Sequence, residues 1–202
     1  EFDGGAIRAS YTDVNVAHST FQLNSAGRGG AIRAYYSPIT VTHSAFYTNT
    51  ATSGRGGGID GLVSKMILED VLIRGNRAAG SGGGVYLHEG DHFNAINSIF
   101  QQNSTSTTGG GLYVRANATT VSATSFLTNT AGDEGGGMYN YQVRSTILND
   151  LIFSGNSAFN GGGLVNATST YNSVSPALDN VLFNENSAIA RGGGVYNDGE
   201  YL

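Results

Sequence analysis

Residues 29–51 read GGAIRAYYSPITVTHSAFYTNTA. This segment begins with the motif Gly29-Gly30-Ala31-Ile32 and contains a second motif, Phe46-x-x-Asn49, near its end. Both motifs recur along the chain in the same order. The glycine clusters open at Gly4, Gly29, Gly56, Gly82, Gly109, Gly135, Gly161 and Gly192, so neighbouring clusters are 25 to 31 residues apart. Two motifs with one shared period indicate a repeat architecture, in which each repeat packs on its neighbours.

The hydrophobic pattern within a repeat has a period of two residues, which predicts β-strands and no helix. Ile32 follows the glycine cluster, Ile39 and Val41 alternate with polar residues, and Phe46 marks a third apolar segment. We therefore predict an all-β fold, a right-handed single-stranded parallel β-helix (a solenoid). It should have about 7–8 turns of 25–31 residues, with three short strands in each turn. The right-handed winding follows the usual crossover rule for parallel strands.

Glycine and asparagine should form the corners of each turn. Glycine permits the positive φ angles that a tight corner requires. Asparagine tolerates left-handed backbone geometry, and its amide can bind the equivalent asparagine one turn away. The predicted corner ladder comprises Asn24, Asn49, Asn76, Asn103, Asn129, Asn156 and Asn186. We also expect the phenylalanines of successive turns to stack inside the coil.

The composition excludes several classes of protein. The 202 residues include 31 glycines and no cysteine, and the formal net charge is -5. Without cysteine the chain has no disulfide framework and no thiolate chemistry. The acidic balance supplies no basic surface for a phosphate backbone, so we expect no nucleic-acid partner. No stretch has the roughly 18 consecutive apolar residues of a membrane helix, so we expect no membrane insertion by this segment.

We expect residues 1–202 to form a single β-helix domain. The chain begins at a glycine cluster without a preceding phenylalanine motif and stops at Tyr201-Leu202 inside an eighth turn. Repeat proteins need caps over their end strands, and the sequence shows no cap at either end. We interpret the chain as part of a longer protein, or as a subunit that associates end to end with its own copies.

The paired motifs Gly4-Gly5-Ala6-Ile7 and Gly29-Gly30-Ala31-Ile32, with Phe-x-x-Asn between them, resemble the repeats of chlamydial polymorphic outer-membrane proteins. In the other six copies glycine replaces the alanine, and the chain differs from that family in having no cysteine. The resemblance covers the whole chain. It implies a β-helix passenger of the autotransporter type, located outside the cell or on its surface, whose short motifs are associated with adhesion.

One residue in each glycine-led strand, directly after the apolar residue, should point outward. These positions hold Arg8, Arg33, Asp60, Tyr86, Tyr113, Tyr139, Val165 and Tyr196. We take Tyr86, Tyr113, Tyr139, Tyr196, Arg8 and Arg33 as candidate binding residues, because a row of tyrosines can present a flat face to a sugar or a protein. The alternative is that like residues stack between turns and stiffen the coil.

The segment His88-Glu89-Gly90-Asp91-His92 contains four side chains of the kind that bind metals. We interpret His88, Glu89, Asp91 and His92 as a solvated loop, because a short loop alone rarely satisfies a metal ion. We therefore expect neither a metal nor a cofactor.

Three sequons for N-glycosylation begin at Asn103, Asn117 and Asn166. Asn103 belongs to the predicted corner ladder, and Asn166 aligns with Asn140 and Asn197, so both are expected to be structural. Asn117 lies in a predicted loop and is the best acceptor of the three.

Three functions are consistent with a β-helix of this kind. The favoured one is a stiff extracellular adhesive or structural module, with no enzymatic activity, that binds a host or cell-surface protein, a glycan or its own copies. Polysaccharide cleavage would need several carboxylates and a base on one face, whereas Asp60, Glu69, Asp70 and Lys65 are expected to diverge. Ice binding would need a regular outward array of threonine. The comparable positions hold Asn15, Thr40, Ile67, Asn94, Thr120, Ile147 and Ala177.

Overall fold

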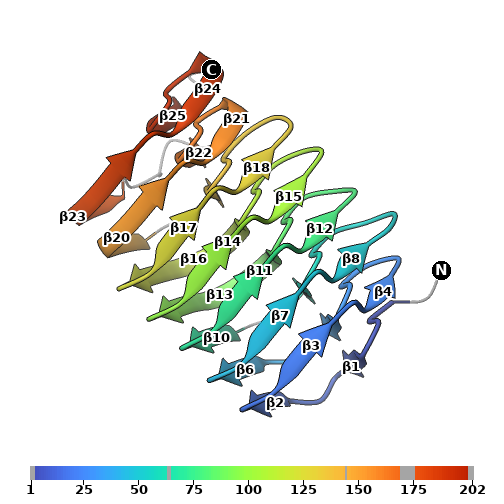
Figure 1. Cartoon of the computed structure of the whole chain (residues 1–202). Helices are drawn as coiled ribbons and strands as arrows, with labels where there is room; N and C mark the ends of the chain where they lie inside the picture. Colours follow the sequence, from blue (N-terminus) through green and yellow to red (C-terminus); the bar gives the residue numbers. More distant parts are fainter. Residues whose placement is uncertain (1–2, 63–64, 144, 169–175, 200–202) are drawn as a thin grey trace.

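A computed structural model describes residues 3–62, 65–143, 145–168 and 176–199 of the chain. All the regular structure in these ranges is β-strand, and the strands coil into a parallel solenoid of about seven turns (Figure 1). Each strand lies parallel to the equivalent strand one repeat further along the sequence, so that Ile7 faces Ile32. The predicted all-β parallel solenoid is confirmed. Within the described ranges no helix could span a membrane.

Three sets of strands carry the predicted pattern. The glycine-led strands are β1 (Ile7–Ser10), β5 (Ile32–Tyr35), β9 (Ile59–Leu62), β13 (Val85–Ile96), β16 (Leu112–Ser122), β19 (Met138–Tyr141), β22 (Leu164–Thr168) and β25 (Val195–Gly199). The second set comprises β2 (Val14–Ala17), β6 (Ile39–Thr42), β10 (Lys65–Glu69), β20 (Ser145–Ser154) and β23 (Ala177–Asn184), together with the later parts of β13 and β16. The third set comprises β3 (Thr20–Gln22), β7 (Ala45–Tyr47), β11 (Leu72–Arg74), β14 (Ile99–Gln101) and β17 (Ser125–Leu127), and the later parts of β20 and β23 complete it.

A fourth, short strand follows each Phe-x-x-Asn motif, in addition to the three strands predicted for each turn. These strands are β4 (Ser25–Ala26), β8 (Thr50–Ala51), β12 (Arg77–Ala78), β15 (Ser104–Thr105), β18 (Thr130–Ala131), β21 (Ser157–Asn160) and β24 (Ser187–Arg191). They form a separate seven-stranded sheet along one side of the solenoid (Figure 1). Most have two residues, too few for an alternating pattern to be recognised.

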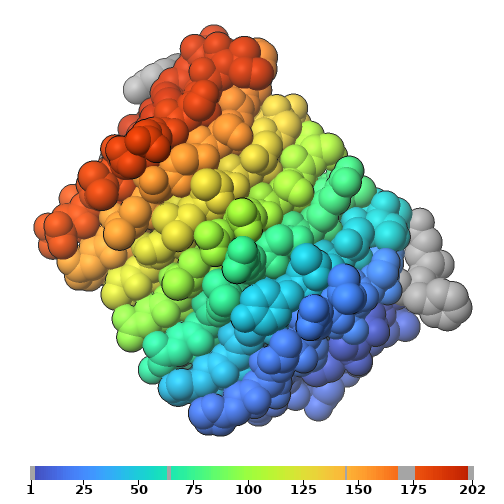
Figure 2. Space-filling model, in the orientation of Figure 1, coloured from blue at the N-terminus to red at the C-terminus, as the bar shows by residue number. Residues whose placement is uncertain are grey.

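Apolar side chains from the first three strand sets fill the inside of the coil. Phenylalanines of adjacent turns stack there: the ring centroids of Phe126 and Phe153 lie 4.7 Å apart, with the ring planes 4° from parallel. Ile73 takes the equivalent place between Phe46 and Phe100. The predicted phenylalanine stack is confirmed. In the space-filling view the turns form successive bands from the N-terminal to the C-terminal end (Figure 2).

The predicted asparagine ladder is also confirmed. Asn103 donates from Nδ2 to the side-chain oxygen of Asn129, at 3.0 Å, and to the carbonyl of Ile73, at 2.9 Å. The same amide-to-amide contact links successive members from the first asparagine of the ladder to the last. These bonds hold each turn to the next from inside the corner.

The prediction that the ladder asparagines have left-handed backbone geometry is wrong. A positive φ is found instead at the residue before the asparagine, such as Gln102 (φ 55°) and Thr128 (φ 51°). The preceding residue therefore makes the corner, and the asparagine side chain lies buried where it can bond to its neighbours. The opening glycines behave as predicted: all eight have positive φ, as at Gly135 (φ 66°).

Candidate functional site

The tyrosine row lies on the glycine-led strands, with Tyr86, Tyr113 and Tyr139 at facing positions. Their rings stack, with centroids 4.6 Å apart for the first pair and 5.4 Å for the second. The three side chains lie outside the main core, but they form a second apolar cluster with Val165 and are at most 9% exposed. The predicted exposed face is therefore not formed by these three residues. Tyr196, at the same register, is half-buried.

Side chains from the preceding loops help to cover this row. The guanidinium carbon of Arg55 lies 4.4 Å from the ring centroid of Tyr86, and Arg55 Nη1 donates to the Tyr86 hydroxyl at 3.0 Å. Burial raises the pKa of the Tyr86, Tyr113 and Tyr139 hydroxyls above their usual value of 10.0. These contacts fit the structural alternative, in which like residues stack between turns and stiffen the coil.

The same row begins with two arginines in different environments. Arg8 is exposed, whereas Arg33 is buried with its Nη1 atom 3.0 Å from Oδ2 of Asp60. The pair is at ion-pair distance but without hydrogen-bond geometry, so Arg33 Nη1 and both Asp60 oxygens lack a hydrogen-bond partner. Burial raises the pKa of Asp60 from 3.8 to about 6, although Arg33 and Arg55 oppose the shift.

The acidic residues that polysaccharide cleavage would need have different environments, which agrees with the expected divergence. Asp60 is buried against Arg33, whereas Glu69 is exposed on β10. Asp70 has a positive φ of 53° and an ion-pair contact of 3.2 Å from Oδ2 to His43 Nε2. No group of three or more potential metal ligands occurs in the described ranges.

The segment from His88 to His92 is not the predicted loop. It lies within β13, which runs without a break from a glycine-led strand into the second strand set, with a shift of register between Leu87 and Gly90. His88 Nε2 lies 2.8 Å from Arg115 Nη1, and burial, with the Arg115 charge, lowers the pKa of His88. Glu89, Asp91 and His92 are exposed along the same strand.

The three sequons differ in accessibility. Asn117 is exposed, and its amide donates to Asp91 Oδ1 at 3.1 Å. It lies within β16 and not in the predicted loop. Asn103 and Asn166 are buried in ladders, as expected, and Asn166 donates to Asn197 at 2.8 Å. Asn117 stays the candidate acceptor.

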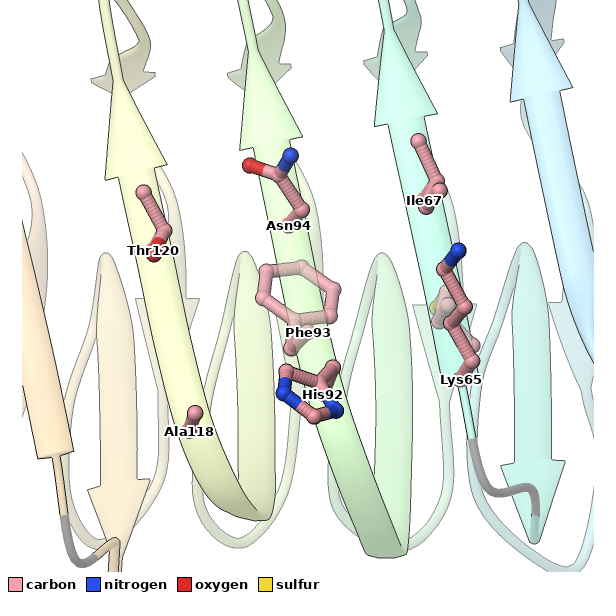
Figure 3. Close-up of a pocket in the computed structure, with 8 residues that line it drawn as sticks. Lys65, Ile67, His92, Phe93, Asn94, Ala118 and Thr120 are labelled. Carbon is pink, nitrogen blue, oxygen red and sulfur yellow. The ribbon is translucent and has the colours of Figure 1, made fainter.

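A hollow of about 380 Å³ lies on the second strand set, where β10, β13 and β16 are neighbours (Figure 3). Lys65, His92 and Ala118 form one row across the three strands, and Ile67, Asn94 and Thr120 form the next. Figure 3 shows these side chains lying across adjacent strands. We call these six residues the lateral hollow.

The lateral hollow combines the chemical groups of a binding surface. Lys65 and His92 supply nitrogen donors, Asn94 and Thr120 supply amide and hydroxyl groups, and Ile67 supplies an apolar contact. Asn94 Oδ1 is buried and has no hydrogen-bond partner. Polar groups beside an apolar contact in a concave place suit the recognition of a polar ligand.

Sequence reasoning missed the lateral hollow. It placed Ile67, Asn94 and Thr120 in one outward row but read that row only for ice binding, and the strand pairing confirms that these residues are in register. The signal that could have indicated the hollow is the neighbouring row. There the small Ala118 follows the longer Lys65 and His92, so the surface is lower at Ala118.

Comparison with protein families identifies the repeat. Residues 70–88 and 180–198 match the Chlamydia polymorphic membrane protein repeat. Each matched segment begins at the corner residue that follows the second strand set, Asp70 or Asn180. It then runs through a Phe-x-x-Asn position, or its equivalent at Ile73, into the next glycine-led strand. The resemblance inferred from the motifs is therefore confirmed at these two places. Comparison with curated proteins and comparison with solved structures found no match. The repeat and the solenoid fold fit an extracellular, adhesin-like module.

Proposed function

We propose that this chain is a surface-exposed, extracellular adhesive module that binds a protein or glycan on another cell and has no enzymatic activity. The match to the Chlamydia polymorphic membrane protein repeat carries the proposal. The matched segments lie in a solenoid whose turns share the same glycine corners and asparagine ladder. A stiff repeat of this kind presents side chains at fixed spacing along its length.

We assign the contact with the partner to the lateral hollow. Lys65, Asn94 and Thr120 bring a positive charge and hydrogen-bonding groups to one concave place on rigid strands. Sites held by strands lose little conformational entropy on binding, because the backbone is already ordered.

Binding of protein-coated beads to cultured epithelial cells tests the proposal. Asn94→Arg places a long charged side chain in the lateral hollow and should reduce the number of bound beads several-fold. Gln101→Arg is the matched control, because Gln101 is also half-buried but lies on β14, in the third strand set. The control should bind as the unmodified protein does.

Three results would contradict different parts of the proposal. Unmodified beads that bind no better than albumin-coated beads would exclude the adhesive function. Equal binding of the Asn94→Arg and Gln101→Arg proteins would exclude the lateral hollow as the contact. Release of unsaturated ends from pectin or alginate would show an enzymatic activity and overturn that part of the proposal.

A further inference from the structure

An exposed aromatic pair stands at the corner that follows the first two glycine-led strands. Tyr11 and Tyr36 are 74% and 50% exposed, and their rings stack with centroids 5.6 Å apart and planes 23° from parallel. Both have positive φ, 57° and 47°, a conformation that is unfavourable for a bulky side chain. The equivalent corner holds Glu89 and Gln142 in later turns, so the solenoid itself does not require an aromatic ring there.

Beside this pair lies a hollow of about 220 Å³ with three arginines. Its lining consists of Asp3, Arg8, Ser10, Arg28, Arg33 and Tyr35, which we call the arginine hollow. Arg8 and Arg33 occupy facing positions on neighbouring strands, where like charges repel each other unless a counter-charge is present. Among the described residues no carboxylate lies within ion-pair distance of Arg8 or Arg28. The hollow therefore holds more positive charge than the protein neutralises.

The aromatic pair and the arginine hollow form one continuous surface through Tyr35. Tyr35 lines the hollow, and its ring centroid lies 5.9 Å from the guanidinium carbon of Arg33. The same ring lies 5.8 Å from the ring of Tyr11 and 4.5 Å from the ring of Tyr36. A ligand can therefore touch the arginines and the tyrosines together.

We propose that this surface binds an acidic saccharide. A carboxylate or sulfate group of the ligand enters the arginine hollow and accepts hydrogen bonds from Arg8 and Arg28, while a sugar ring lies on Tyr11 and Tyr36. Guanidinium groups suit such oxyanions because their planar donors match the spacing of the oxygen atoms. Asp3 already places a carboxylate 4.0 Å from Arg33 Nε at the rim, so it competes with the ligand.

The dimensions favour a sugar over an extended polyanion. The hollow, of about 220 Å³, is a confined site for a charged group, and the two stacked rings beside it offer apolar surface with hydroxyl groups at the edge. The net charge of -5 repels a long polyanion from the remaining surface, so recognition depends on this local site. The site is separate from the lateral hollow. The inference rests on the proposed adhesive function only in taking a short acidic glycan of a cell surface as the source of the ligand.

Titration with defined oligosaccharides at about 0.15 M salt tests the inference. The probes are a heparin tetrasaccharide, a hyaluronan tetrasaccharide that carries carboxylates alone, neutral cellotetraose and a poly-glutamate peptide. We expect one or both acidic sugars to bind and cellotetraose to bind at least about 10-fold more weakly. Comparison of the first two probes distinguishes sulfate from carboxylate as the preferred group.

Matched variants connect the binding to the site. Arg8→Ser and Tyr36→Ser should each weaken binding about 10-fold, whereas Asp3→Asn should strengthen it about 3-fold. Arg77→Ser and Tyr47→Ser remove the same side chains elsewhere and should leave affinity unchanged, because neither residue lines the arginine hollow. Circular dichroism of each variant checks that it is folded.

Three results would overturn the inference. They are the absence of binding by either acidic sugar, an equal effect of Arg8→Ser and Arg77→Ser, and tighter binding of poly-glutamate than of both sugars. If saccharide binding fails while bead adhesion still depends on Asn94, only this inference falls. If adhesion fails and saccharide binding persists, the proposed adhesive function falls instead.

Discussion

Arg33 Nη1 and Asp60 Oδ2 lie 3.0 Å apart across neighbouring glycine-led strands, and the Asp60 side chain is fully buried. Burial raises the pKa of this carboxyl from 3.8 to about 6. The folded state therefore binds the proton more tightly than the unfolded chain does. The stability contributed by this protonation is fully present below about pH 4 and is lost as the pH rises through about 6.

Lowering the pH from about 7.5 to about 4.5 should make the Asp60 carboxyl stabilise the fold by about 2 kcal/mol. Asp60→Asn cannot take up this proton, so its free energy of unfolding should lack this gain. Urea unfolding followed by circular dichroism at both pH values measures the difference. Asp179→Asn, at an exposed site, serves as the control and should keep the pH dependence of the unmodified protein. The same pH dependence in all three proteins would contradict the prediction.

Asn103→Ala should lower the free energy of unfolding by about 3 kcal/mol or more. The substitution removes the bonds from Asn103 Nδ2 and leaves the backbone amide of Asn76 without its buried acceptor. Denaturation by urea measures the loss. Asn117→Ala is the matched control, because Asn117 is exposed, and it should cost less than about 0.5 kcal/mol. Comparable losses in the two variants would argue against a ladder that holds the turns together.

Gly135→Ala should be much more destabilising than Gly155→Ala. Both glycines have a φ of 66°, so the cost of the left-handed backbone is shared. A Cβ at Gly135 would lie 2.6 Å from the carbonyl oxygen of Met138, whereas at Gly155 the nearest atom is the Thr128 methyl carbon at 3.1 Å. We expect a loss of about 1 kcal/mol at Gly155 and at least about twice that at Gly135, measured as the shift in thermal midpoint. A larger shift for the Gly155 variant would refute this account of the corner.

Tyr113→Ala should destabilise the fold by about 3 kcal/mol, because the ring is buried between Tyr86 and Tyr139. Tyr11→Ala should cost less than about 1 kcal/mol, since that ring is mostly exposed. Thermal unfolding of the two variants makes the comparison. A neutral effect at Tyr113 would restore the tyrosine row as a candidate binding face.

The period and the chemistry of the corners could be predicted from the sequence because they recur in every turn. Gly135 and Asn103 each belong to a register of like residues, and repetition separates such positions from their neighbours. The short strands such as Ser25–Ala26 could not be predicted, since two residues carry no alternation. These short strands form because each turn pairs with the next along its whole length.

The exposure and shape of the candidate sites depend on neighbouring side chains that are not part of the two repeated motifs. Tyr86 occupies an outward register, yet Arg55, from the loop before the glycine cluster, covers its ring. The lateral hollow arises from differences in side-chain size at Lys65, His92 and Ala118, which occupy one register. The polar segment around Gly90 is typical of a loop, but Gly90 pairs with Ala116 and the segment lies in a strand.

The bonds between turns, such as that from Gly111 to the carbonyl of Gly137, run along the axis of the coil. Tension applied along this axis therefore loads the junctions between turns in series, so every turn carries the same force. A turn at the end of the coil pairs with one neighbour only, so it should detach first. Under such tension the coil should lengthen in a sawtooth of nearly equal steps, each releasing one turn of about 26 residues and about 90 Å of chain. A tether of this kind lengthens gradually under shear and does not fail at once.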